Sequence, residues 1–294
     1  MALKFVIAWE EELKKEGNVD LELSGLLDGL HKYGAEAFLI PADYAGEKDL
    51  AQILNENCLN PEEGLVLAAR DASLAQAEGL PIATAAFLHP AFQGESLLAA
   101  QILVEGFEEV DFYFLERIYN RKHHIPWRVI DTKRCYLREM QEEDLDALYE
   151  LYAGKDMTKY IEPLYADRAK EAEYMRAYIA NQYYYYGYGM WVVIEQATGK
   201  LIGRAGLDNR KIHDEIELEM GYAVAADHHR QGYATEICLA IISYAEEFLE
   251  FPRINCLVDQ ENEASVQLLL KLGFSWKEEI LTDGEWMQRY VYTF

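Results

Sequence analysis

Short apolar runs alternate with helical patterns over the first 127 residues, and this alternation limits what the segment can fold into. The five apolar runs have the length of buried strands and lie at 5–8, 37–40, 65–69, 82–86 and 101–104. Amphipathic segments lie between them at 21–33, 49–57 and 72–78, and a last one follows at 111–124. This pitch predicts a mostly parallel sheet with helices on its faces, a Rossmann-like α/β/α domain over residues 1–127.

The chemistry of this first domain is weakly specified. It has neither G-x-G-x-x-G nor G-x-x-x-x-G-K-S/T, so the common dinucleotide and triphosphate loops are absent. The layout faintly resembles the haloacid-dehalogenase phosphatase fold, but that family needs Asp-x-Asp after its first strand, where this chain has Trp9-Glu10-Glu11. The resemblance therefore implies a degenerate, non-catalytic relative. Asp71 is predicted to cap a helix, although ligands also bind at the carboxyl end of such strands.

The pattern changes around residues 127–138, and a second domain is expected over 134–294. A strand, an acidic helix start and an amphipathic helix are predicted over 135–152, and an apolar hairpin over 190–207. The later elements are a strand, a glycine-containing loop that becomes a long helix, a second strand and a helix closed by glycine; they occupy 216–225, 228–250, 253–259 and 262–274.

This series resembles the GNAT N-acetyltransferase superfamily over about residues 134–294. Three motifs carry the resemblance, which are Glu219-Met220-Gly221-Tyr222, the loop-helix HHRQGYATE, and Asn262-x-x-Ser265 leading into Lys271-Leu272-Gly273-Phe274. Their order and spacing look most like the branch that contains the ribosomal-protein N-terminal acetyltransferases. The resemblance implies a mixed-sheet acyl-CoA acyltransferase fold that moves an acetyl group from acetyl-CoA to an amine.

The resemblance also implies where acetyl-CoA binds. The family loop R/Q-x-x-G-x-G/A corresponds here to His229-x-x-Gly232-x-Ala234, so His229 departs from the usual first residue. Backbone N–H groups at a helix N-terminus can hold pyrophosphate, and small residues permit its close approach, although a glycine can also simply open a helix. The residues expected at the cofactor are Ala223, Val224, Ala225, His229, Arg230, Gln231, Gly232, Tyr233, Ala234, Thr235 and Asn262.

Acetyl transfer needs a base for the ammonium group of the acceptor and a group that stabilises the leaving thiolate. Glu219 matches the strand glutamate of the family and is the expected base. Glu217 shares its face, so that one carboxylate could raise the pKa of the other, unless either simply faces solvent. The tyrosine that many members use as an acid is replaced by Leu269, and Ser265 is expected to take its place, unless it only hydrogen-bonds at the helix start.

The composition of the chain limits the classes of partner that it can bind. The formal net charge of −25 is spread evenly over the chain, which argues against nucleic acid and anionic membranes and permits attraction of a cationic amine. No apolar stretch approaches a membrane span, the N-terminus lacks the pattern of a secretory signal, and four scattered cysteines suggest reduced thiols, so a cytoplasmic protein is expected. The adjacent histidine pairs lack the spacing of metal ligands, and no metal site is predicted.

One further segment is unusual. Tyr183 to Tyr186 cannot all face one side of a helix, so some are expected in the core and some at the surface, where one or two could line an acceptor pocket. The sequence specifies neither the acceptor, a small-molecule amine or a peptide N-terminus, nor the oligomeric state. Two rival functions stay open: a non-enzymatic acyl-CoA-binding or regulatory protein, and a phosphatase or nucleotide binder in the first domain.

Overall fold

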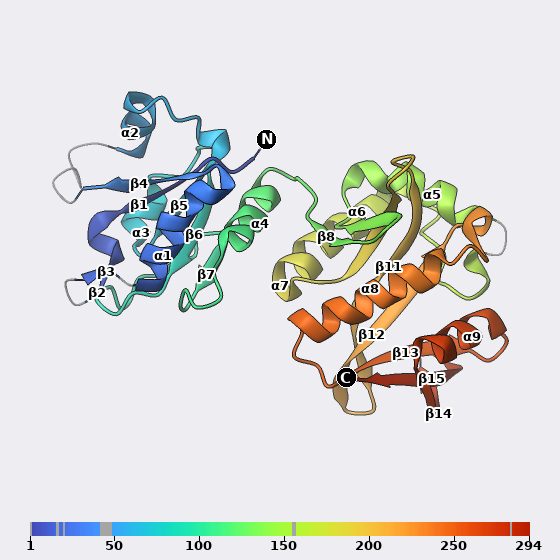
Figure 1. The fold of residues 1–294 in the computed structure, drawn as a ribbon. Coiled ribbons are helices and arrows are strands. Elements are labelled where there is room, and N and C mark those ends of the chain that lie inside the picture. The colour runs from blue at the N-terminus through green and yellow to red at the C-terminus, as the bar shows by residue number, and fades with distance from the viewer. Residues whose placement is uncertain (1, 16–17, 20, 42–48, 155–156, 283) are drawn as a thin grey trace. The chain divides into compact units, whose positions relative to one another are not determined.

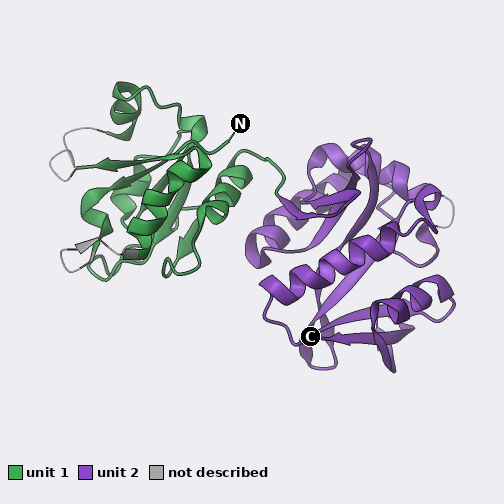
Figure 2. Cartoon of the chain, in the orientation of Figure 1, with its two compact units in different colours: residues 1–127 green, residues 128–294 purple. Residues whose placement is uncertain are grey.

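The computed structural model describes the chain apart from residues 1, 16–17, 20, 42–48, 155–156 and 283. The chain forms two compact units, residues 1–127 and residues 128–294, which Figure 2 shows in different colours. No helix among the described residues is both long enough and apolar enough to cross a membrane.

The first unit is built on a parallel five-stranded sheet (Figure 1). Its strands, in the order in which they pair, are β4 (Glu36–Ile40), β1 (Phe5–Trp9), β5 (Gly64–Ala68), β6 (Ala83–Phe87) and β7 (Ile102–Val104). The chain therefore runs from β1 to one side and then continues on the other side from β5. This reversal creates a switch point between β1 and β5, the place where doubly wound sheets usually bind ligands.

Helices cover both faces of that sheet because its strands are apolar on both sides. Helices α1 (Leu21–Gly29) and α4 (Phe112–Lys122) share one core with Val6 and Leu65. Helices α2 (Leu50–Glu56) and α3 (Asp71–Ala75) share the other with Ile7 and Val66. A short hairpin, β2 (Lys14–Lys15) with β3 (Asn18–Val19), completes the unit.

Two carboxylates lie at the carboxyl edge of this sheet and are used internally. Asp71 is the first residue of α3 and does not cap it, so the predicted cap is wrong; its carboxylate instead accepts hydrogen bonds from the amides of Ser96 and Leu97, at 2.8 and 2.7 Å. Those bonds lower the pKa of Asp71. Glu12 is fully buried and accepts the Ala69 amide at 2.6 Å and the Ser73 hydroxyl.

The second unit has a mixed sheet, as predicted, and the sheet contains eight strands. The strands pair in the order β14 (Ser275–Thr282), β15 (Glu285–Thr293), β13 (Arg253–Asp259), β12 (Glu215–Val224), β11 (Leu201–Ile212), β10 (Met190–Glu195), β9 (Cys135–Arg138) and β8 (Arg128–Asp131). Every neighbouring pair is antiparallel except β12 with β13.

One continuous core joins this sheet to its helices. The helices are α5 (Leu145–Tyr152), α6 (Arg168–Tyr178), α7 (Tyr184–Tyr186), α8 (Tyr233–Phe248) and α9 (Glu263–Leu272). Helix α8 buries Ile237 and Ile241 in that core, and α9 ends where Gly273 adopts a φ of 96°. The tyrosine run divides as predicted, with Tyr183 fully buried and Tyr185 81% exposed.

Candidate active site

The parallel strands β12 and β13 separate soon after they meet. They pair only at Leu218 with Ile254 and at Glu219 with Asn255, although both strands continue for several residues beyond. Figure 1 shows the two arrows diverging. The backbone edge of β12 beyond Glu219 is thus left without a strand partner on the β13 side. This gap in the hydrogen-bond ladder is the opening between β12 and β13.

The direction of each peptide group decides which residues face this opening. The Ala225 amide donates to the Ile202 carbonyl of β11 at 2.7 Å. Because successive peptide groups in a strand point to opposite edges, the Ala223 amide also faces β11, whereas the amide and carbonyl of Val224 face the opening. Of the three strand residues expected at the cofactor, Val224 is therefore the one whose amide faces the opening.

A loop from the end of β12 leads into α8. Gly232 stands at the N-cap position with a φ of 81°, a left-handed conformation that suits glycine. No side chain caps the helix, so the first amides of α8, which include those of Tyr233, Ala234 and Thr235, carry no internal partner. This uncapped helix start is suited to a phosphate group.

Two side chains of this loop bind backbone carbonyls close to them in the sequence. The His229 ring lies with Nε2 at 2.8 Å from the Val224 carbonyl, and Gln231 donates to the Asp227 carbonyl at 2.6 Å. These two side chains are therefore engaged within the chain. Arg230 is exposed and has a positive φ of 59°.

Arg134 is a cation beside this loop that the sequence did not indicate. Its Nη1 donates to the Gln231 carbonyl at 2.9 Å, its Nε pairs with Glu236 at 2.7 Å, and its guanidinium lies 4.0 Å from the centre of the Tyr233 ring. The Tyr233 hydroxyl in turn donates to Glu195 at 2.6 Å. Arg134 lies almost a hundred residues before the loop, so no local motif connects the two.

Two carboxylates face each other across β11 and β12. Glu219 is directly opposite Asp208, and Arg210 Nε lies 3.6 Å from a Glu219 carboxylate oxygen. Tyr178 donates to Asp208 at 3.1 Å, and burial raises the pKa of that aspartate. The Glu219 side chain is 23% exposed, so it is accessible to a reactant. Asp208 was not identified from the sequence because the polar end of β11 carries no motif.

Glu217 has a different role from the one its spacing suggested. Its side chain is 7% exposed and binds Arg253 at 2.7 Å, Arg289 at 3.2 Å and the Asn255 amide at 3.1 Å. The hydrogen bond from Arg253 is the main reason that the pKa of Glu217 is lowered. The expected pairing, in which one glutamate raises the pKa of the other, is thus wrong for Glu217.

The start of α9 lies on the β13 side. Asn262 caps this helix by accepting the Ser265 amide at 3.2 Å, a structural use of a side chain that was expected near the cofactor. Ser265 lies beside the phenol of Tyr222, which comes from β12. Leu269, at the position of the missing acid, is fully buried in the core.

The comparisons identify the family. A model described as acetyltransferase (GNAT) domain matches residues 134–275. The chain is 30% identical over 154 residues to the uncharacterized N-acetyltransferase p20 of Bacillus licheniformis, covering 52% of this chain and 85% of that protein. The chain belongs to the GNAT acetyltransferase family. The uncharacterized N-acetyltransferase YoaA of Bacillus subtilis is 29% identical over 153 residues, again 52% of this chain and 85% of the relative.

A putative GnaT-family acetyltransferase from Bordetella pertussis is a structural neighbour with 20% identity and a TM-score of 0.48, covering 56% of this chain and 99% of the other. The GNAT domain makes the protein an acyltransferase. GNAT enzymes use acetyl-CoA, and the residues here suit that molecule: the uncapped start of α8 offers amides for its pyrophosphate, and the β12 edge offers the Val224 amide for its arm.

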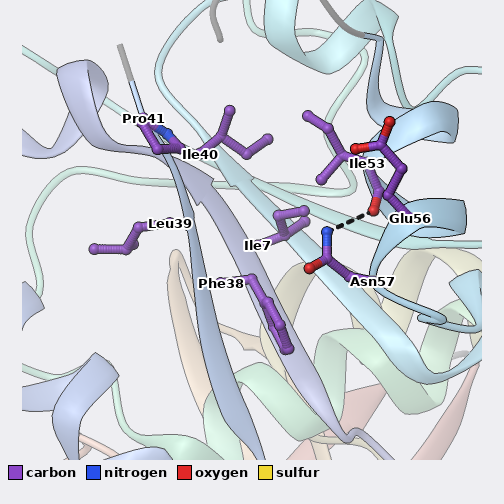
Figure 3. Close-up of a pocket in the computed structure, with 8 residues that line it drawn as sticks. All are labelled: Ile7, Phe38, Leu39, Ile40, Pro41, Ile53, Glu56 and Asn57. Atoms are coloured by element: carbon purple, nitrogen blue, oxygen red, sulfur yellow. Dashed lines mark hydrogen bonds between the residues drawn. The ribbon is translucent and has the colours of Figure 1, made fainter. Parts of the chain in front are cut away.

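The first unit offers no comparable chemistry in its described residues. A hollow of about 400 Å³ lies beside the edge strand β4 and is lined mainly by apolar residues (Figure 3). Its two polar side chains are Glu56 and Asn57, and the Asn57 amide donates to the Ile53 carbonyl at 2.8 Å. No group of three or more potential metal ligands occurs in the described parts of either unit.

Proposed function

We propose that the second unit transfers an acetyl group from acetyl-CoA to a primary amine by direct attack in a ternary complex. One observation carries the proposal: β12 and β13 part directly after Glu219, and the strand that parts leads into an uncapped helix start. A carboxylate, an open strand edge and a phosphate-binding turn thus follow one another within sixteen residues, from Glu219 to Ala234.

Each residue has a role in this proposal. The amides at Gly232–Thr235 bind the pyrophosphate, and Arg134 adds a positive charge beside them. Val224 positions the arm through its amide. Glu219 accepts, directly or through water, the proton that the acceptor ammonium must lose before its nitrogen can attack. Ser265 stabilises the leaving thiolate in place of the missing acid tyrosine. The acceptor is a small-molecule amine or a peptide N-terminus, attracted in part by Asp208 and Glu219.

Thiol release from acetyl-CoA with a panel of amines and peptides tests the activity. Glu219→Gln is expected to lower turnover by about 10²-fold or more while leaving acetyl-CoA affinity, measured by calorimetry in the micromolar range, nearly unchanged. Glu279→Gln, which removes an exposed glutamate from the outer strand β14, is the matched control and should leave both values unchanged. Unchanged turnover in Glu219→Gln would place the base elsewhere.

The family assignment argues against the rival function, a non-enzymatic acyl-CoA-binding protein, although the departures at His229 and Leu269 are the features that pointed to it. His229 covers the Val224 carbonyl, and Leu269 provides no acid. Binding of acetyl-CoA without thiol release on the whole panel would support it. Incubation with labelled acetyl-CoA alone distinguishes direct attack from a mechanism with an acetylated enzyme intermediate, because direct attack leaves no acetyl group on the protein.

For the first unit we propose a non-catalytic role in a fold related to the haloacid-dehalogenase layout. The switch point between β1 and β5 is filled by the chain itself, since Glu12 follows β1 and binds Ala69 and Ser73, which follow β5. Absence of phosphate release from phosphate esters by the full chain is the expected result. Release that survives Glu12→Gln but is abolished by Glu10→Gln would contradict the proposal.

A further inference from the structure

The Tyr222 hydroxyl is a buried polar group without a hydrogen-bond partner among the described residues. Most buried hydroxyls in proteins are satisfied, and an orphaned one is costly, so it calls for an explanation. Tyr222 lies three residues beyond the last paired position of β12, in the stretch from which β13 has diverged. Its phenol packs against the core of the second unit while its oxygen has nothing to bond.

The surroundings of this oxygen contain few polar groups. Ser265, in the first turn of α9, is the polar side chain beside it, but the two do not reach hydrogen-bond geometry. The buried thiols of Cys238 and Cys256 are the other titratable neighbours. Cys256 already donates to the Met220 carbonyl at 3.2 Å. Burial raises the pKa of Tyr222, so the phenol stays protonated and remains a donor throughout the pH range in which an enzyme works.

The proposed reaction assigns Ser265 alone to the leaving sulfur. Leu269 stands where an acid tyrosine would be and cannot donate. A protonated phenol with no partner, beside Ser265 and at the opening between β12 and β13, has the required chemistry. We infer that the Tyr222 hydroxyl donates a hydrogen bond to the thioester sulfur of acetyl-CoA as the carbon–sulfur bond breaks, with Ser265 beside it. This inference rests on the proposed function.

The proton and electron balance favours a hydrogen bond over full proton transfer. In the step, the amine nitrogen bonds to the acetyl carbon, the carbon–sulfur pair passes to sulfur, and Glu219 takes the proton lost by nitrogen. A thiol has a pKa of about 8.5, below that of even an unperturbed phenol, so Tyr222 keeps its proton and stabilises the negative sulfur through the bond. This is stabilisation by a fixed donor aimed at developing charge.

The test compares the binding of two ligands that differ only at sulfur. Coenzyme A carries the thiol, and desulfo-coenzyme A carries hydrogen in its place. The wild-type protein should bind coenzyme A about five- to tenfold more tightly by calorimetry at pH 8.5, where part of the thiol is ionised. In Tyr222→Phe this preference should fall to about onefold, while the affinity for desulfo-coenzyme A stays the same.

Two further readouts separate this role from a structural one. Tyr222→Phe removes an unsatisfied hydroxyl, so its melting temperature should be equal to or above that of the wild type, while its kcat falls by about 10²-fold at an unchanged KM for acetyl-CoA. The control Tyr290→Phe removes a buried hydroxyl that is satisfied by Gln288 at 3.1 Å; it should lower the melting temperature and leave the ligand preference intact. Ser265→Ala should reduce the preference only in part.

The outcomes are distinct. An unchanged preference for coenzyme A in Tyr222→Phe, with normal turnover, overturns the inference and leaves the proposed function standing. A wild-type protein that binds neither ligand overturns both. If Tyr222→Phe fails to fold, the phenol is needed for packing and the graded loss expected in Ser265→Ala decides the question, because an unaltered ligand preference there would also overturn the inference.

Discussion

At the scale of single residues, Glu217 and Glu219 differ in what surrounds them and not in type. Both lie on one face of β12, two positions apart. Glu217 is enclosed by Arg253, Arg289 and Asn255, whereas Glu219 is partly exposed and has Arg210 at 3.6 Å. The first carboxylate is therefore held within the sheet, and the second is the one that we propose as the base.

Glu217→Gln should consequently destabilise the second unit by about 3 kcal/mol, because it leaves the buried Arg289 with less compensating charge. The pKa of Glu217 is lowered in the folded state from 4.5, so its contribution is present above about pH 4.5 and is lost as the pH falls through the lowered value. Urea unfolding of the wild type and variant between pH 3 and 7 measures this. Equal loss of stability in Glu219→Gln would contradict the distinction between the two residues.

At the scale of elements, Gly232 at the start of α8 allows the effect of a substitution on stability to be distinguished from its effect on ligand binding. A Cβ at Gly232 would find only Arg134 Nη2, at 3.6 Å, so there is room for alanine apart from the strain of its positive φ. We expect Gly232→Ala to weaken acetyl-CoA binding by tenfold or more, because the added methyl stands at the helix start where the phosphate approaches.

Gly34→Ala is the matched control for that change. Gly34 has a φ of 78°, also has free space for a Cβ, and ends a helical turn in the first unit. Both variants should lose a similar 1–2 kcal/mol of stability from the left-handed conformation, roughly the cost for an L-residue. Only Gly232→Ala should change the calorimetric affinity. Equal effects of the two on acetyl-CoA affinity would remove the loop from the binding site.

The elements that local pattern defines were the ones predicted well. The run predicted at 65–69 is β5 at 64–68, because a short buried parallel strand needs little more than its apolar residues. The hairpin predicted to end at residue 207 continues to Ile212, because Asp208–Lys211 are polar and are held by pairing with β12 instead of by an apolar pattern. The terminal hairpin β14–β15 was missed, since Trp276, Leu281 and Trp286 are exposed and give no clean alternation.

The same physics limits what the sequence indicates about the site. The loop and the strand carrying Glu219 are contiguous and were found from their spacing. Arg134 and Asp208 are brought to the candidate site by contacts with distant elements, and Tyr222 is distinguished by a hydroxyl without a hydrogen-bond partner among the described residues. Neither property leaves a local signature in the sequence. Asn262 was expected near the cofactor. Its side chain instead caps α9, which could not be predicted without knowing at which residue the helix begins.

At the scale of the whole molecule, two units with separate cores should respond separately to perturbation. In calorimetry of the full chain, acetyl-CoA at 100 times its Kd should stabilise the second unit by about 2.7 kcal/mol and leave the other transition in place. Glu12→Gln should act on the first unit alone. Burial raises the pKa of Glu12 in the folded state, so wild-type stability declines as the pH rises through that raised value.

The side-chain amide in Glu12→Gln keeps an oxygen that accepts the Ala69 N–H, and its NH₂ group can donate to the Ser73 hydroxyl. It carries no charge that burial would penalise. The first-unit transition of Glu12→Gln should therefore match the wild type near pH 4.5 and lie above it at pH 7. Added salt supplies the contrast: since the net charge of −25 is divided evenly, screening should raise both transitions together. If acetyl-CoA also raises the transition that Glu12→Gln moves, the two units unfold as one, and ligand binding in the second is energetically coupled to the first.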